Sequence, residues 1–284
     1  MTTPLLSFEF FPPRTDAQAR RFWHTLGCLE TLKPEWFSVT YGALGSASKA
    51  SIDTVAQLCK ESSKPIAAHL TCAGQTRSQL STTLAQFKAI GVKHIVALRG
   101  DSTPEGSGGK FYNLRFAIEL VELIAESGDF DISVAAYPEV HPEAASAQAD
   151  LEVLKRKFDA GASRALTQFF FEPEVFLRWR DEAVKHGIDG SLIPGILPIH
   201  NIDKVVDFSR RCGATVPNAL IERFNSANTE HVAQEMSIEH CVDLCQSLKH
   251  EGVEKFHLYT LNQSDLSYEV AKSLLGVKTD NVAA

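Results

Sequence analysis

Polar residues occur within apolar segments at places where they could carry acid–base chemistry. Glu9 lies between Phe8 and Phe10, where burial would raise its pKa and keep it protonated, so that it could donate a proton. The alternative at this position is a structural carboxylate paired with an arginine such as Arg14. His69, within AAHLTC, is either a functional group or a histidine of the core. These two side chains are the first candidates for general acid–base catalysis.

A second group of candidates is the sequence Arg99, Gly100 and Asp101. These residues directly follow an apolar segment, and they place the guanidinium of Arg99, which can bind an anion, close in sequence to the carboxylate of Asp101. A helix N-cap with a neighbouring salt bridge would have the same sequence. Other apolar segments also contain or precede polar residues, namely Thr40, Tyr41, Thr71, Tyr137, His141, Gln168, Tyr259 and Asn262. What these residues can do depends on the elements that bring them together.

Eight short segments have the composition of β-strands, and longer segments with helical periodicity separate them. The strand-like segments are residues 5–11, 36–42, 66–72, 94–100, 131–138, 164–171, 192–199 and 255–262. The helical segments are residues 16–32, 51–62, 77–90, 114–126, 143–160, 173–186 and 202–212, followed by 217–224, 230–250 and 265–276. Most strand ends recur roughly every 30 residues, which is the length of one βα unit.

Eight βα units in a row predict an α/β protein with a single domain over residues 1–284. The expected fold is a (β/α)8 TIM barrel with an extra helix in the last βα unit. The alternative, an open doubly wound sheet, usually carries a Gly-rich phosphate loop after its first strand. The first strand-like segment instead runs into FFPPR at 10–14, and the sequence has no G-x-G-x-x-G or G-x-x-x-x-G-K-[ST] motif. In a barrel, the polar residues at the strand ends would surround one site.

The composition of the 284 residues is that of an ordinary globular protein, with 44% hydrophobic and 22% charged residues and a mean hydropathy of -0.09. A formal net charge of -7 disfavours binding to nucleic acid or to an anionic membrane. The apolar segments are shorter than the roughly 20 residues that cross a bilayer, and the first residues do not form a signal peptide. These features predict a cytoplasmic protein whose partners are small molecules.

The sequence does not favour metal or covalent chemistry. Its six cysteines are irregularly spaced without a C-x-x-C pair, so reduced thiols are expected. Cys241 and Cys245 are one helical turn apart, but no second pair could complete a metal site. The strand cores contain no lysine for a Schiff base apart from Lys255 at an edge, and there is no G-x-S-x-G motif. No metal site is predicted.

Longer motifs at the strand ends resemble the methylenetetrahydrofolate reductase family. They are SFEFFPPR (7–14), VTYGA (39–43), AHLTC (68–72), HIVALRGD (94–101), DISVAAYPEVHPEA (131–144), TQFFF (167–171), PGILP (194–198) and FHLYTLN (256–262). The motifs follow in order along the whole chain. The chain therefore looks like the short bacterial-type form, a catalytic barrel without an added regulatory domain.

The resemblance implies a flavoprotein that works in two half-reactions. FAD at the carboxyl face of the barrel would accept a hydride from NADH or NADPH and pass it to 5,10-methylenetetrahydrofolate, giving 5-methyltetrahydrofolate by ping-pong kinetics. Glu9 corresponds to the family's general acid, which opens the imidazolidine ring of the substrate. Asp101 corresponds to a carboxylate beside the flavin and the folate, where its charge would steady the cationic iminium.

The resemblance also assigns binding residues. The family's FAD contacts correspond to Tyr41, Ala43, His69, Arg99, Gly100, Asp101, Tyr112, Tyr137, His141, Ala144, Asp150, Arg156 and Lys157. Arg156 and Lys157 would bind the diphosphate, although a K-R-K run alone is typical of a solvated helix face. Thr40 corresponds to a contact of the nicotinamide dinucleotide and Gln168 to a folate contact. Phe208 corresponds to an aromatic residue that packs against whichever substrate lies over the flavin.

Two residues depart from the family pattern at positions that touch the folate. Lys204 stands where Gln is usual, and Gln263 stands where Arg is usual. Loss of an arginine removes a charge-assisted contact to a substrate carboxylate, so a raised folate KM with an intact flavin half-reaction is expected. The alternatives are a FAD- or folate-binding paralogue without reductase turnover and a flavin reductase for another pterin-like substrate. The resemblance further implies a homo-oligomer and favours NADH over NADPH.

Overall fold

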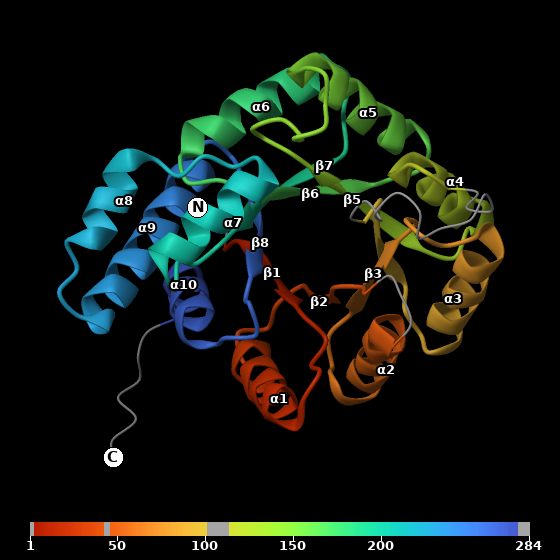
Figure 1. The fold of residues 1–284 in the computed structure, drawn as a ribbon, viewed down its shortest axis with the longest axis horizontal. Coiled ribbons are helices and arrows are strands. Elements are labelled where there is room, and N and C mark those ends of the chain that lie inside the picture. The colour runs from red at the N-terminus through yellow and green to blue at the C-terminus, as the bar shows by residue number, and fades with distance from the viewer. Residues whose placement is uncertain (1–2, 43–45, 101–113, 278–284) are drawn as a thin grey trace.

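Eight parallel strands form a closed barrel (Figure 1). The computed structural model describes residues 3–42, 46–100 and 114–277. Each strand pairs with the next along the chain, and the last pairs with the first. The strands are β1 (Leu5–Phe10), β2 (Trp36–Val39), β3 (Ile66–Thr71), β4 (His94–Leu98), β5 (Asp131–Ala136), β6 (Arg164–Phe169), β7 (Ser191–Ile196) and β8 (Lys255–Tyr259). The predicted (β/α)8 barrel is confirmed.

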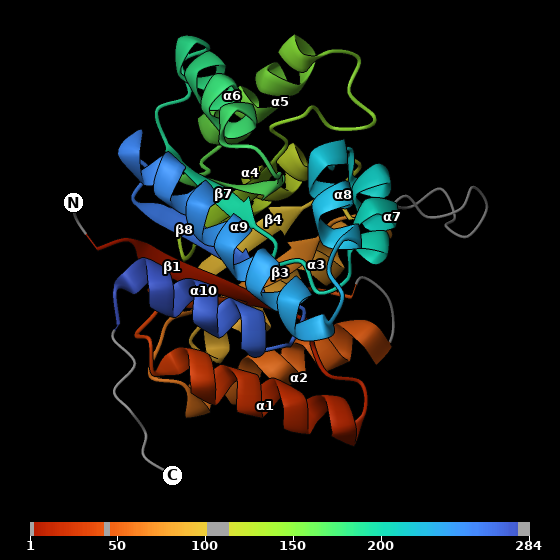
Figure 2. The same cartoon turned by 90° about the vertical axis from the view of Figure 1, so that its left-hand side faces the viewer.

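The helices surround this barrel (Figure 1). They are α1 (Asp16–Glu30), α2 (Ser46–Glu61), α3 (Arg77–Ala89), α4 (Ala117–Ser127), α5 (Ala147–Asp159), α6 (Pro173–Lys185), α7 (Ile202–Cys212), α8 (Asn218–Asn225), α9 (Glu230–His250) and α10 (Asp265–Leu275). The helices beyond one per βα unit are α8 and α9, which follow α7 between β7 and β8. Helix α10 follows β8 and packs against α9 (Figure 2). Among the described residues, no helix is long and apolar enough to cross a membrane.

The side chains of β1 alternate between the helix layer and the barrel interior, as the strand period of two requires. Phe8 and Phe10 are fully buried, and the ring of Phe10 lies 5.1 Å from that of Phe22 in α1 and 5.7 Å from that of Phe37 in β2. Glu9 faces the other way, into the barrel, where it approaches side chains of β3 and β8. The aromatic layer outside thus fixes the strand that carries this carboxylate inside.

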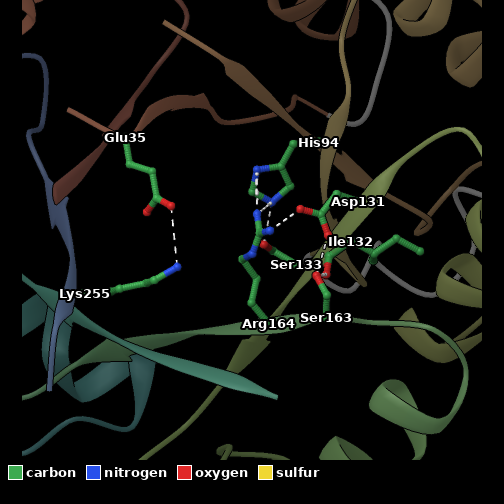
Figure 3. A network of polar contacts seen from close by, with 8 residues as sticks. All are labelled: Glu35, His94, Asp131, Ile132, Ser133, Ser163, Arg164 and Lys255. Atoms are coloured by element: carbon green, nitrogen blue, oxygen red, sulfur yellow. Dashed lines mark hydrogen bonds and ion pairs between the residues drawn. The ribbon is translucent and has the colours of Figure 1, made fainter. Parts of the chain in front are cut away.

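The barrel interior has an apolar middle and polar ends. The middle consists of Trp36, Ala67, Val96, Leu166 and Ile193. At the amino ends of the strands, Arg164 contacts His94 and forms an ion pair with Asp131 (Figure 3). Lys255 and Glu35 form a further ion pair at this end, with 3.5 Å between Nζ and Oε1. The amino end of the barrel is thus closed by paired charges, and the carboxyl end carries the site.

Candidate active site

Two adjoining cavities lie at the carboxyl ends of the strands. The first has a volume of about 290 Å³. It is lined by residues of β1, β3, β4, β5, β6 and β8, by residues of the loops after β1, β2, β5, β7 and β8, and by Phe208 of α7. The second has a volume of about 620 Å³ and lies beside β4, β5 and α5. Leu98, Ala135 and Tyr137 line both cavities, so the two adjoin one another.

The first cavity brings together residues that the sequence assigned to acid–base chemistry and to substrate binding. Of the predicted set, it is lined by Glu9, Thr40, Tyr41, His69, Tyr137, Gln168 and Phe208. Phe208 of α7 is 40% exposed and stacks on Phe169 of β6, with 5.4 Å between the ring centroids. A half-exposed aromatic ring in the wall of a cavity is suited to cover a flat ring system.

Glu9 is held by two imidazoles. Its Oε2 atom lies 3.4 Å from Nε2 of His69 and 3.6 Å from Nε2 of His257. The backbone of Glu9 is also fixed, because the hydroxyl of Thr260 donates to its carbonyl oxygen at 2.6 Å. The Glu9 side chain is 14% exposed, and it lines the first cavity. A carboxylate in this position can exchange a proton with a bound molecule.

The expectation that burial keeps Glu9 protonated is wrong. Burial does raise the pKa of this carboxyl, but the contact with His257 and the charges of both imidazoles outweigh it, so the pKa lies below its usual value of 4.5. Phe8 and Phe10 flank Glu9 in the sequence and suggested an apolar environment for its carboxyl group. Both side chains face the helix layer, however, so they do not surround this carboxyl group. The ionisable side chains that contact Glu9 are the two histidines, whereas the backbone nitrogen of Arg14 donates to Oε1 of Gln18.

Burial also decides the state of His69. It lowers the pKa of this imidazole to about 4, although the charge of Glu9 acts in the opposite direction. His69 is therefore neutral near pH 7. Its side chain is 5% exposed and lines the first cavity, so it is both a buried histidine and a wall of the site.

Arg99 and Gly100 shape the wall of the second cavity. The guanidinium of Arg99 forms a bidentate ion pair with Glu143, with Nη2 donating to Oε1 at 2.8 Å. Gly100 has a φ of +86°, and a Cβ at this position would lie 3.0 Å from Cβ of Thr71. Glycine permits both the left-handed turn and the close approach to β3. This turn fixes the point at which the chain leaves β4 beside Arg99.

The remaining wall of the second cavity comes from the start of α4, from α5 and from the loop before α5. Lys157 is half-buried, donates from Nζ to the carbonyl oxygen of Ala135 at 3.1 Å, and has a pKa that burial lowers to about 8. Asp150 accepts a hydrogen bond from the backbone nitrogen of His141 at 2.9 Å, which ties the loop to α5. The predicted FAD contacts that line this cavity are Arg99, Gly100, Tyr137, His141, Ala144, Asp150, Arg156 and Lys157.

Some predicted residues lie elsewhere. Ala43, Asp101 and Tyr112 fall outside the described residues. In the part of the chain that the structure describes, Lys204 and Gln263 are not among the residues that line the two cavities. Lys204 lies in the first turn of α7, one turn before Phe208 and on the same side of the helix. The backbone nitrogen of Gln263 donates to the carbonyl oxygen of Thr260, which lines the first cavity.

The sequence reasoning missed His257 and its partner Ser7. His257 is fully buried, and its Nδ1 lies 2.7 Å from the hydroxyl oxygen of Ser7. Strand alternation could have found His257, because Lys255, His257 and Tyr259 are spaced by two and so share the interior face of β8. Ser7 and Glu9 share the interior face of β1 for the same reason.

The fold and the site define a (β/α)8-barrel protein with two adjoining cavities at the carboxyl ends of its strands, lined by ionisable and aromatic side chains. Residues 2–275 match the family model described as methylenetetrahydrofolate reductase. The chain is 44% identical over 276 residues to 5,10-methylenetetrahydrofolate reductase of Pectobacterium carotovorum subsp. carotovorum, covering 97% of this chain and 91% of that protein. It is 42% identical over 270 residues to the Escherichia coli protein of that name, covering 95% and 90%. The chain belongs to the methylenetetrahydrofolate reductase family.

Two more distant similarities have narrower meanings. "Methylenetetrahydrofolate reductase (NADH) 1" of Arabidopsis thaliana is 29% identical, and the match covers 95% of this chain and 47% of that protein. A solved structure of an uncharacterized Clostridium thermocellum protein, described as binding two copies of 5-methyl-5,6,7,8-tetrahydrofolic acid, matches with a TM-score of 0.67. It is 12% identical, and the match covers 97% of this chain and 96% of that one. At this identity the likeness establishes the fold alone.

Proposed function

We propose that this chain reduces 5,10-methylenetetrahydrofolate to 5-methyltetrahydrofolate, with FAD as the carrier between NADH or NADPH and the folate. The family and the names of the bacterial relatives support the reaction. The observation that carries the assignment of the site is the pair of adjoining cavities, of which Glu9 lines one and Arg99 and Lys157 line the other. The name of the plant relative favours NADH as the hydride donor.

The second cavity fits FAD by its charge. Arg99, Arg156 and Lys157 line it together with Glu143 and Asp150. Because Arg99 is paired with Glu143, Arg156 and Lys157 are the cations that would bind a diphosphate without a Gly-rich loop. The bound flavin would supply the hydride transfer between the two substrates. Lys157 would bring a half-buried ammonium to the diphosphate, and Tyr137, which lines both cavities, would lie where cofactor and substrate meet.

The first cavity would hold the substrate. Phe208 and Phe169 offer stacked rings for the pterin or the nicotinamide, and Gln168 offers an amide for polar groups of the folate. Glu9 would give a proton to the ring nitrogen that leaves the methylene carbon. Because its pKa is low in the protein alone, Glu9 must gain this proton within the site. Thr40 as a nicotinamide contact and Asp101 as the second catalytic carboxylate stay predictions.

A second candidate is a paralogue that binds FAD and folate but turns over the folate poorly or uses another pterin. It is favoured by Lys204 and Gln263, which stand close to the first cavity without lining it and differ from the family pattern. The retention of Glu9 in the cavity wall supports the reductase instead. The cytoplasmic location and the homo-oligomer stay predictions.

Anaerobic stopped-flow absorbance tests the proposal on FAD-loaded protein. NADH should bleach the flavin, and 5,10-methylenetetrahydrofolate should restore its absorbance. Glu9→Gln should slow only the second step, by roughly 100-fold or more, because that step needs the acid. Glu35→Gln is the matched control, since Glu35 pairs with Lys255 at the opposite end of the barrel.

Two results would contradict this function. A wild-type flavin that NADH bleaches but the folate does not reoxidise would favour the paralogue. If Glu9→Gln reoxidises as fast as the wild type, Glu9 is not the acid.

A further inference from the structure

The residue that follows strand β1 presents an aromatic ring to the first cavity. Because the side chains of a strand alternate, Phe11 continues the interior face of β1 that carries Glu9. Its side chain is 45% exposed and lines the first cavity, as that of Glu9 does. Of the aromatic residues among the described ones that line this cavity, Phe11 and Phe208 are the two that are exposed. The cavity thus has an accessible ring beside β1 as well as on α7.

A single side chain holds the backbone of Phe11. The amide group of Asn262 accepts a hydrogen bond from the Phe11 nitrogen and donates one to the Phe11 carbonyl oxygen, both at 2.8 Å. The pairing of β1 with β8 ends at Glu9 and Tyr259, so the Asn262 amide continues it one step further, from a residue 251 positions along the chain. The following residue, Pro12, restricts the backbone of Phe11 as well.

Asn262 is itself held in a sparsely populated backbone conformation. Its φ is +57° and that of Leu261 is +50°, both in the left-handed region, which asparagine tolerates better than leucine does. The Asn262 nitrogen donates to the hydroxyl oxygen of Thr260 at 3.0 Å, and its carbonyl oxygen accepts from the hydroxyl of Thr25 at 3.3 Å. Such backbone strain persists where the surroundings determine one conformation, and it is concentrated at functional sites. The turn directs the Asn262 amide toward the end of β1.

A ring held in this way is suited to contact a flat substrate. The folate of the proposed reaction carries a pterin and an aminobenzoyl ring, and aromatic rings pack favourably on one another. A wall that is already ordered before binding loses less conformational freedom when the substrate arrives. Leu261, from the same turn as Asn262, lines the first cavity too. In the described part of the chain, Asn262 lines neither cavity, so it acts on a bound molecule through its neighbours.

We propose that Phe11 is a substrate contact in the first cavity and that Asn262 is a positioning residue that holds it there. This inference rests on the proposed function. The ring of Phe11 contributes apolar contact to the binding of the folate and takes no part in proton transfer. The Asn262 amide keeps this ring at the wall of the cavity, above the carboxyl group of Glu9 on the same face of β1.

The other role open to the Asn262 amide is closure of the barrel. Strands β1 and β8 are the first and the last, and Asn262 joins the segments that follow them. A bond that only closes the barrel would contribute to stability, and its loss would leave the folate affinity of the folded protein unchanged. Coupling between Phe11 and Asn262 in the folate affinity therefore distinguishes the two roles.

The test measures the affinity of oxidised, FAD-loaded protein for 5-methyltetrahydrofolate by isothermal titration calorimetry. Phe11→Ala should bind it about tenfold more weakly, because the apolar contact with the ring is lost. Phe11→Tyr, which keeps the ring, should bind it as the wild type does. Asn262→Gly keeps the left-handed turn but removes the amide, and it should weaken binding about fivefold by freeing the Phe11 backbone.

The double variant decides whether Asn262 acts through Phe11. Its affinity should equal that of Phe11→Ala, because no ring is left for Asn262 to position. Glu30→Ala is the matched control, since Glu30 accepts from the Ser63 nitrogen at 2.9 Å and from the Ser62 hydroxyl at 2.8 Å at the amino end of the barrel. It should lower the urea midpoint and leave the affinity unchanged. Additive losses in the double variant would overturn the role of Asn262.

Hydrogen exchange of the Phe11 amide is a readout that needs no substrate. Exchange should be about fivefold faster in Asn262→Gly than in the wild type, and unchanged in Glu30→Ala. Equal exchange in Asn262→Gly and the wild type would show that the amide does not hold Phe11. If the wild type turns over the folate and Phe11→Ala binds the product as tightly, this inference alone fails. If the wild type neither turns over the folate nor binds the product, the proposed function fails and the Phe11 contact fails with it.

Discussion

Lys157 holds an ammonium group in the wall of the second cavity. Helix α5 carries it, its Nζ donates to the carbonyl oxygen of Ala135, and burial lowers its pKa from 10.5 to about 8. The amine is therefore mostly protonated at pH 7 and mostly neutral at pH 9. A bound diphosphate would interact with the charged form alone, so the affinity for FAD should depend on pH in this range.

FAD should bind more weakly as the pH rises from 7 to 9. The charged fraction of Lys157 falls about tenfold over this interval, and the affinity should follow it. Lys157→Met should weaken binding at pH 7 by tenfold or more, the worth of a charged hydrogen bond, and should abolish the pH dependence. Lys155→Met is the control, since Lys155 pairs with Asp159 on the same helix. Fluorescence titration of the apoprotein measures these affinities, and an equal pH dependence in Lys157→Met would refute the assignment.

At the scale of residues, the sequence was sufficient to find candidate site residues but not to predict which side chains surround them. Glu9 and His69 were found, and they do line one cavity. The state of Glu9 could not be predicted, because the two imidazoles come from strands 60 and 248 residues away along the chain. His257 escaped notice for a similar reason, since its apolar neighbours Phe256 and Leu258 point into the helix layer.

At the scale of elements, all eight strands and the helices between them could be predicted, because the periods of two and 3.6 are strong in long segments. The helix ends were harder. The predicted helix over 143–160 begins only at Ala147, since Ser146 caps it and Glu143 turns to Arg99 in the second cavity. The predicted helix over 114–126 begins at Ala117, because Glu119 accepts from the backbone nitrogens of residues 115 and 116. Side chains that cap helices or line the site set these limits.

Strand β7 makes room for Tyr259 at the mouth of the barrel. The pairing of β6 with β7 is irregular between Leu166 and Phe169, and the carbonyl oxygen of Thr167 accepts from the hydroxyl of Tyr259 at 2.6 Å. Gly195 lies beneath this contact. A Cβ there would lie 2.2 Å from the Thr167 oxygen and 2.6 Å from Cε2 of Tyr259. Because Gly195 has no side chain, β7 can pair with β6 while the ring of Tyr259 lies against them and lines the first cavity.

Gly195→Ala should destabilise the protein by about 1–3 kcal/mol, the usual cost of overpacking, and displace Tyr259 from the first cavity. Gly27→Ala in α1 is the matched control, because a Cβ there meets nothing within 4 Å. It should stabilise the protein by about 0.5–1 kcal/mol, since alanine favours a helix interior over glycine. Urea denaturation measures both. Equal stability of Gly195→Ala and the wild type would show that the barrel relaxes around the methyl group.

At the scale of the whole molecule, the barrel places neutral histidines at both ends of its interior. Burial lowers the pKa of His69 to about 4 near the carboxyl end, and burial together with the charge of Arg164 lowers the pKa of His94 to about 3 near the amino end. Asp131, which pairs with Arg164, has a pKa below its usual value, because hydrogen bonds and positive charges outweigh its burial. These groups all bind fewer protons in the folded protein than in the unfolded chain.

The protein should therefore lose stability as the pH falls below about 6.5, which is above the pH range in which protonation of carboxylates alone would destabilise it. Between pH 6.5 and 4, His69 and His94 take up a proton in the unfolded chain but stay neutral in the folded barrel. Asp131 adds to the loss of stability as the pH approaches the pKa that it has in the unfolded chain. Each histidine should account for a loss on the order of 2 kcal/mol by pH 5. Urea midpoints at pH 7 and pH 5 measure this loss. It should shrink in His94→Gln, whatever the variant's stability at pH 7, and persist in His231→Gln, whose side chain is 79% exposed on α9. A loss of the same size in His94→Gln would mean that other groups take up the protons.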